Sequence, residues 1–192
     1  MPVHHVVVNS KKFWVGIEAG VLPPKSLQDI LEITSKISSK TETSITIVDP
    51  SIIVSDIQCL LAIRNALTAF EKGRNISKKL EIEILIRLSG QRQIKDAISI
   101  SAPKNPVRQL AMLVVAKNRH SVEAAVNEVT EQLNISVDRR LLQVDSIKER
   151  LVMEKYGIDS SELEATYAMN RKEALVKCVL SRMAELEAKI KK

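Results

Sequence analysis

The stretch AFEKGRNISKKLEIEILIRLSGQRQIKDAI, residues 69–98, decides how the rest of the chain is interpreted. Over residues 81–88 the even positions are all isoleucine or leucine, and most odd positions carry charge. This period of two is typical of a half-buried strand. Ser89-Gly90 breaks the pattern, and helical spacing follows. The stretch therefore predicts a strand, a turn and a helix that carries Arg92 and Lys95 in its first turns.

A strand, a turn and a helix in this order can hold an anion. The first amide groups of a helix lack intrahelical partners, and the macrodipole adds partial positive charge there. Gly90 would let a ligand approach the backbone closely. The simpler interpretation is that Ser89 caps the helix and Gly90 makes the turn, because one glycine is far short of a glycine-rich phosphate loop.

The same residues carry a family resemblance. The segment LEIEILIRLSGQRQIKDAI, from residue 80 to 98, resembles the core motif of the small KEOPS-complex subunits, also called PRPK-binding proteins. VDPSIIVSDIQCLLAIRNALTAFEKGRN resembles the segment that leads into it, and EALVKCVLSRMAELEA resembles the last helix of the family. The resemblance covers roughly residues 43 to 190. We predict a single PRPK-binding-like domain over residues 1–192.

The resemblance implies a function. KEOPS forms N6-threonylcarbamoyladenosine in tRNA, and this family supplies a non-catalytic subunit. That subunit binds the kinase-like ATPase subunit and, in archaeal forms at least, recruits tRNA through its 3′ CCA end. On this basis we expect an electropositive face for the tRNA backbone, with aliphatic pockets for bases because aromatic residues are few. The expected tRNA-binding residues are Lys72, Arg74, Ile76, Leu88, Gly90, Arg92 and Lys95. The alternative is that the basic residues form salt bridges with Glu71 and Asp96.

The C-terminal helix is the predicted interface with the kinase-like subunit. Residues 171–190 carry two adjacent apolar stripes at spacings of three and four, a wider apolar surface than one packing contact needs. One stripe can dock on the domain while the other stays free for the partner. The expected interface residues are Leu175, Val176, Val179, Leu180 and Met183. The alternatives are that both stripes are buried within the chain, or that they form a homodimer.

The remaining pattern predicts an α/β (α+β) fold. We expect four or five strands in a mostly antiparallel or mixed sheet, with helices on both faces. The predicted strands lie near residues 4–8, 13–18, 44–48, 81–88 and 110–117. Helices are predicted from about Ser26, from Asp49-Pro50-Ser51 and from Ser121, and the part from about 145 to 192 is predicted to be helical. Arg64 interrupts the apolar surface of the second helix, either at its edge or facing a groove.

Composition limits the classes of protein to which the chain can belong. The 192 residues carry a net charge of +6 and are 45% hydrophobic, which favours a packed domain and permits an acidic partner such as RNA. Cys59 and Cys178 are expected to be reduced and buried, as in a cytoplasmic protein. The alternative is that the two form a disulfide, which the sequence leaves open. We expect no membrane span, secretory signal, metal or cofactor, and no catalytic set is recognisable. The competing function is a small-molecule or phosphate-using enzyme built on the Ser89-Gly90 turn.

Overall fold

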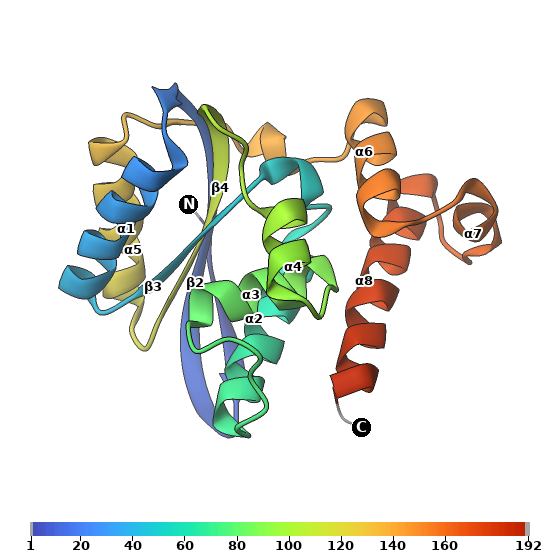
Figure 1. Cartoon of the computed structure of the whole chain (residues 1–192), viewed down its shortest axis with the longest axis horizontal. Helices are drawn as coiled ribbons and strands as arrows, with labels where there is room; N and C mark the ends of the chain where they lie inside the picture. Colours follow the sequence, from blue (N-terminus) through green and yellow to red (C-terminus); the bar gives the residue numbers. More distant parts are fainter. Residues whose placement is uncertain (1, 191–192) are drawn as a thin grey trace.

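An antiparallel sheet organises the chain in a computed structural model that describes residues 2–190 (Figure 1). The strand order is β1-β2-β4-β3, and β5 pairs with β2. The first hairpin joins β1 (Val3–Val8) to β2 (Lys11–Lys25). Its two turn residues, Asn9 and Ser10, have φ of 46° and 65°. Positive φ at both positions matches the right-handed twist of the flanking strands.

The middle of the sheet is β4 (Val107–Ala116), which pairs antiparallel with β2 and with β3 (Ser44–Val48). Its near-continuous apolar run is explained by this position, because both faces of a central strand are covered. Four of the predicted strands and the antiparallel arrangement are therefore confirmed. The two-residue strand β5 (Ser136–Val137) has no counterpart among the predictions.

Helices cover both faces of the sheet, which confirms the predicted α/β class (Figure 1). One face packs against α1 (Leu27–Thr41) and α5 (Arg119–Gln132). The other packs against α2 (Asp56–Glu71) and α3 (Leu80–Ser89), and α4 (Ile94–Ser101) follows α3. Each face thus has its own apolar core, and the sheet separates the two.

A further helical layer lies outside α2 and α3 (Figure 1). It consists of α6 (Ser146–Tyr156), α7 (Ser160–Ala165) and α8 (Arg171–Ile190), so the helices predicted for this part of the chain are confirmed. Gly157 ends α6 in the left-handed conformation, with φ of 61°. None of the helices within residues 2–190 combines the length and the apolar character that a membrane crossing requires.

The strand predicted over residues 81–88 is wrong, because this segment is the helix α3. The reason is that α3 is buried on nearly all sides. Its Ile84, Leu85 and Leu88 pack into the core beneath the sheet, and Ile86 packs toward α8. In a helix with apolar side chains on opposite faces, the apolar residues no longer recur every three or four positions. The sequence of such a helix can then alternate between apolar and charged residues, as in a strand.

Two helix starts also differ from the predictions. The segment after Asp49 forms a short 3-10 helix, Pro50–Ile52, and α2 begins only at Asp56 because the chain is extended between them. The carboxylate of Asp49 accepts a hydrogen bond from the amide of Ser51 at 2.9 Å, which closes that short turn. The second difference is at α5, where Asn118 is the N-cap and accepts from the amide of Ser121 at 2.7 Å.

The two cysteines are free and buried, as predicted. Cys59 lies in α2 and Cys178 in α8, both within the core that these helices share with the sheet. Burial raises the pKa of the Cys59 thiol far above its usual range, so the thiol stays protonated and unreactive.

Candidate functional site

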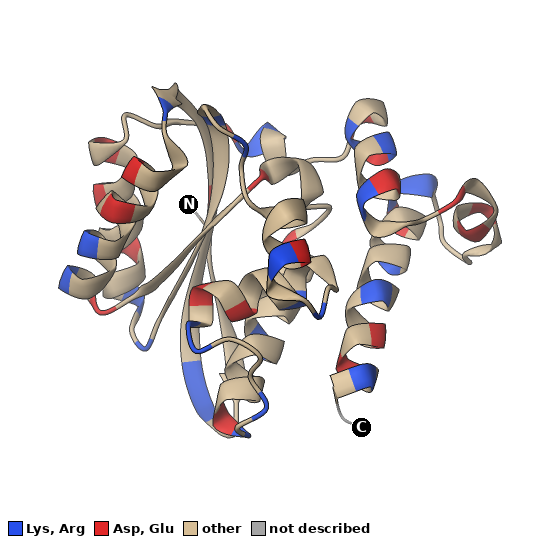
Figure 2. Cartoon of the chain, in the orientation of Figure 1, with Lys and Arg blue, Asp and Glu red and all other residues tan. Residues whose placement is uncertain are grey.

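A hollow of about 230 Å³ lies where the end of α2 meets α3 and the end of α8. Two of the predicted tRNA-binding residues, Lys72 and Arg74, line it. Both are exposed and belong to the turn that follows α2. Figure 2 shows how the Lys and Arg positions are distributed along the backbone. Arg64, one of the residues whose role was left open, also lines this hollow from α2. We call these three side chains, with Arg87 beneath them, the basic hollow.

A buried ion-pair cluster supports the basic hollow. Glu83 is fully buried, and its Oε2 accepts from the backbone amides of Ile76 and Ser77 at 2.9 and 2.8 Å. Its Oε1 accepts from Nε of Arg87 at 2.9 Å, and Arg87 in turn donates to Glu187 of α8 at 2.6 Å. The cluster fixes the loop before α3 against the two helices, so the hollow has a rigid base.

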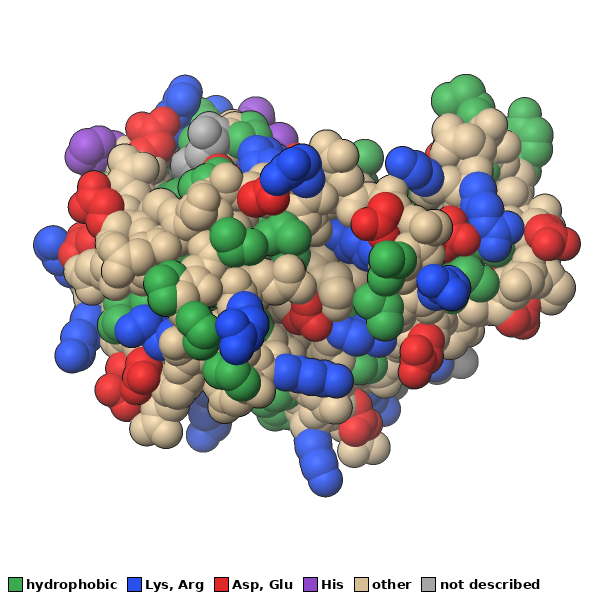
Figure 3. All heavy atoms as spheres, turned by 90° about the horizontal axis from the view of Figure 1, so that it is seen from above, with side chains coloured by type: hydrophobic (Ala, Val, Ile, Leu, Met, Phe, Trp, Pro, Cys, Tyr) green, Lys and Arg blue, Asp and Glu red, His purple; other side chains and the backbone are tan. Residues whose placement is uncertain are grey.

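The rim of the basic hollow carries uncompensated positive charge. Within residues 2–190, no carboxylate lies within 4.0 Å of the charged groups of Arg64, Lys72 or Arg74. Glu71, which was one expected partner, pairs instead with Lys11 at 3.1 Å. Clustered cations without partners attract anions such as phosphate groups. The opposite pattern appears in Figure 3, where positive and negative side chains alternate over the face seen from above.

The other predicted cations, Arg92 and Lys95, are exposed but do not join the basic hollow. They follow α3, whereas Arg74 precedes it. A helix of ten residues is about 15 Å long, so the two groups lie near its opposite ends. The structure therefore divides the predicted electropositive face into two separate parts.

The anion-binding turn predicted at Ser89-Gly90 does not form. Gly90 is the C-terminal cap of α3 in the left-handed conformation, so the helix end at this turn is the negative one. The predicted following helix, α4, begins only at Ile94, so Arg92 precedes it and does not lie in its first turns. A Cβ at Gly90 would lie 3.1 Å from the carbonyl oxygen of Arg182 in α8. The segment that packs closely against the backbone at Gly90 is therefore α8. Residues 89 and 90 therefore do not form the predicted turn between a strand and a helix N-terminus.

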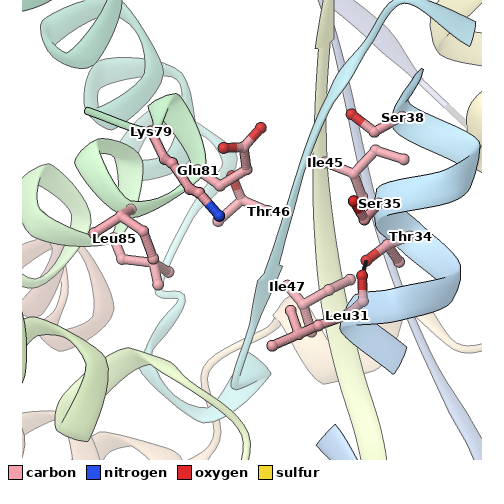
Figure 4. Close-up of a pocket in the computed structure, with 11 residues that line it drawn as sticks. Leu31, Thr34, Ser35, Ser38, Ile45, Thr46, Ile47, Lys79, Glu81 and Leu85 are labelled. Atoms are coloured by element: carbon pink, nitrogen blue, oxygen red, sulfur yellow. Dashed lines mark hydrogen bonds between the residues drawn. The ribbon is translucent and has the colours of Figure 1, made fainter. Parts of the chain in front are cut away.

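The two aliphatic residues proposed for a base pocket lie elsewhere. Leu88 is fully buried in the main core. Ile76 is half-buried and packs with Ile82 and Ile190 in a small cluster between α3 and α8. A pocket of about 400 Å³ lies between α1, β3 and α3 (Figure 4), but different residues line it, and they are aliphatic and polar in similar number.

The apolar stripes of α8 are divided between core and surface. Leu175, Val179 and Met183 are buried in the core, which leaves them no accessible surface. Val176 and Leu180 are half-buried at the edge of the same core. Of the five predicted interface residues, only this second pair has surface available to another molecule.

Sequence reasoning missed two contributors to the basic hollow, Arg87 and Glu187. Both were hidden by the incorrect strand prediction, since their contact requires that α3 and α8 lie side by side. The signal that could have revealed the first was the spacing of four between Glu83 and Arg87, which is typical of an ion pair on one helix.

Comparison with known families decides where the chain belongs. The model of the family described as "Kinase binding protein CGI-121" matches residues 25–186, which is most of the chain. The chain belongs to this family. The matched region of this CGI-121 chain runs from the end of β2 into the last turns of α8. It therefore contains all four cations of the basic hollow and the half-buried pair on α8.

Two relatives of this CGI-121 chain match over shorter stretches. The KEOPS complex subunit Cgi121 of Pyrococcus abyssi is 57% identical over 35 residues, 18% of this chain and 20% of the relative. The regulatory protein Cgi121 of Methanocaldococcus jannaschii is 29% identical over 94 residues, 49% of this chain and 59% of the relative. The chain thus matches less than two thirds of the length of either relative.

Proposed function

We propose that this chain is a non-catalytic subunit of a KEOPS-type complex that forms N6-threonylcarbamoyladenosine in tRNA. The observation that carries the proposal is membership of a kinase-binding family over residues 25–186. The names of the two relatives, a KEOPS complex subunit and a regulatory protein, support the same role. In this role the chain uses no cofactor and binds the kinase-like ATPase subunit.

The kinase-like subunit is proposed to dock on the outer side of α8. Val176 and Leu180 lie on neighbouring turns of this helix and keep part of their surface exposed. Ala184 continues the same line one turn further and is exposed. A partner helix or sheet edge that covers this line would bury apolar surface without disturbing the core.

The tRNA is proposed to bind at the basic hollow through the backbone near its 3′ CCA end. Support comes from the three unpaired cations on the rim and from the rigid base that Glu83 and Arg87 provide. Lysine and arginine contacts to phosphates supply most of the affinity in such interfaces and make it sensitive to salt. Arg92 and Lys95 would extend the contact along the neighbouring backbone.

Two assays test the proposed function. Co-purification with the kinase-like subunit should recover a stable complex, and filter binding should show tighter association with tRNA that has its CCA end than with tRNA that lacks it. The isolated chain should not hydrolyse ATP. If ATP hydrolysis followed the protein through purification, or if neither the kinase-like subunit nor tRNA bound, the subunit role would be wrong.

A further inference from the structure

Two large apolar side chains on the loop between α7 and α8, residues 166–170, are almost fully exposed. Tyr167 is 95% exposed and Met169 is 91% exposed, and we call these two residues the exposed pair. The next most exposed large apolar residues within the described chain, Ile57 and Ile147, are 62% exposed. Isolated apolar residues on a surface need no explanation, whereas neighbouring ones indicate a contact surface.

The loop that carries the exposed pair is fixed against the first turns of α8. The ammonium of Lys177 donates to the carbonyl of Tyr167 at 2.7 Å, and the amide of Met169 donates to the carboxylate of Glu173 at 2.9 Å. Between the two, Ala168 is half-buried and packs against the main core. The exposed pair is therefore directed outward by a loop whose backbone is held in place.

The side chains of α8 also orient the ring of the exposed pair. Lys177 pairs with Glu173 at 2.9 Å, and its ammonium lies 5.7 Å from the centre of the Tyr167 ring. A side chain that is oriented in the free chain loses little conformational freedom when a partner covers it. Tyrosine and methionine are also enriched in protein interfaces. The exposed pair thus has the composition and the rigidity of an interface anchor.

The exposed pair lies next to the half-buried residues of α8. Glu173, which holds the loop, is three residues before Val176, and residues at this spacing are neighbours on a helix. Lys177 has the same relation to Leu180. From Glu173 to Leu180 the helix rises by about 10 Å. Figure 1 shows α7 at the outer end of the molecule, beyond α8 as seen from the sheet. One partner can therefore cover the loop and the half-buried residues together.

We propose that the exposed pair anchors the kinase-like subunit, which receives the ring of Tyr167 and the side chain of Met169 in an apolar groove. This inference rests on the proposed function and extends its interface from α8 to the preceding loop. Membership of a kinase-binding family over residues 25–186, which include the loop, supports this partner. The tRNA is a poor candidate, because Glu187 lines the basic hollow and lies about 21 Å along α8 from Glu173.

Titration of the purified kinase-like subunit with the full chain tests the anchor. Tyr167→Ala and Met169→Ala should each raise Kd about tenfold, and the double variant about a hundredfold. Tyr167→Phe keeps the ring and should retain most of the affinity. All these variants should keep the wild-type Tm, because the side chains are exposed. Leu31→Ala is the control, since Leu31 is 48% exposed on α1, across the sheet from α8, and it should bind normally.

The outcomes separate this inference from the proposed function. If the wild-type chain did not bind the kinase-like subunit, the proposed function and the anchor would both be wrong. If the wild-type chain bound and the double variant bound as tightly, only the anchor would be wrong. A change from dimer to monomer on Tyr167→Ala would assign the exposed pair to self-association and would contradict the proposal.

Oxidation of Met169 gives a second measurement that needs no variant. Among the methionines within residues 2–190, Met169 is exposed, Met153 is half-buried, and Met112 and Met183 are buried. Peroxide converts an accessible methionine to its sulfoxide, which mass spectrometry detects. The kinase-like subunit should slow the oxidation of Met169 about tenfold, whereas tRNA should leave its rate unchanged. Equal rates in the free chain and in the complex with the kinase-like subunit would contradict the proposal.

Discussion

The guanidinium of Arg87 and the carboxylate of Glu187 lie 2.6 Å apart and join α3 to α8 across 100 residues of sequence. Arg87 is 1% exposed and also contacts the fully buried Glu83. The base of the basic hollow is thus a three-residue cluster in which one cation serves two carboxylates. Its members differ in burial, and this difference gives the first prediction.

Glu83→Gln should destabilise the chain by about 3 kcal/mol, because it removes the charge that balances a buried guanidinium. Glu187→Gln should cost about 1 kcal/mol or less, since that side chain is 26% exposed and water can replace it. Urea denaturation of the two variants at neutral pH measures both values. Equal losses would show that the buried carboxylate has no special role.

Gly90 and Gly73 form a matched pair for a backbone prediction. Both have positive φ, 69° and 61°, but a Cβ at Gly90 would meet the backbone of Arg182 whereas Gly73 faces open space. Gly73→Ala should cost about 1 kcal/mol from the left-handed conformation alone, and Gly90→Ala about 1 kcal/mol more from the contact with α8. Thermal or urea unfolding measures the difference. If the two variants were equally stable, α8 would not be packed tightly on this turn.

The stability of the chain should rise with pH because of Lys148. Burial lowers its pKa from 10.5 to about 8, and its ammonium donates to the carbonyl of Leu141 at 2.7 Å. Between pH 8 and 10.5 the unfolded chain binds more protons at this site than the folded chain, so the free energy of unfolding increases with pH there. Below pH 8 the full penalty for burying the charge is present.

Comparison with Lys148→Met isolates this effect. The wild-type chain should gain on the order of 2 kcal/mol relative to that variant between pH 7.5 and 10. Lys78→Met, an exposed lysine, serves as the control and should follow the wild type. A wild-type curve parallel to that of Lys148→Met over this pH range would mean that the ammonium is solvated in the folded state.

The position of Leu180 makes the kinase interface testable. Leu180→Glu should leave the chain folded, because the side chain is only half-buried, and should abolish co-purification with the kinase-like subunit. Ser181→Glu adds the same charge at the next, exposed position and should bind normally. Leu175→Glu, at a fully buried position, should unfold the chain. Normal binding by a folded Leu180→Glu variant would place the interface elsewhere.

The sequence was sufficient for most of the sheet, because β1, β2, β3 and β4 follow simple apolar alternation or an apolar run. It was misleading for α3, where burial on several sides produced a strand-like pattern over residues 81–88. Because residues 81–88 were predicted to be a strand, Gly90 was interpreted as a possible anion-binding turn, whereas it is the C-terminal cap of α3. No local pattern could show that α8 would cover this turn, since the contact with Arg182 joins segments more than 90 residues apart.

The candidate site was predicted only in part for the same reason. Lys72 and Arg74 were found because they form a basic turn that is visible in the sequence. Leu88 and three residues of the C-terminal stripe are apolar in any arrangement, and only the packing of α8 on α3 shows which of them are buried. The pocket between α1, β3 and α3, which Thr46 and Lys79 line, is formed by segments that are far apart in sequence. No sequence motif therefore predicts it.

The most direct test of the account is the affinity of the chain for tRNA as a function of salt. A variant with Arg64, Lys72 and Arg74 changed to Gln should bind tRNA with a slope of log K against log salt reduced by about 2, because each phosphate contact contributes about 0.7 to 0.9. Arg92→Gln with Lys95→Gln, at the other end of α3, should change the slope less. If the triple variant kept the wild-type slope and affinity while it remained folded, the basic hollow would not be the tRNA-binding site.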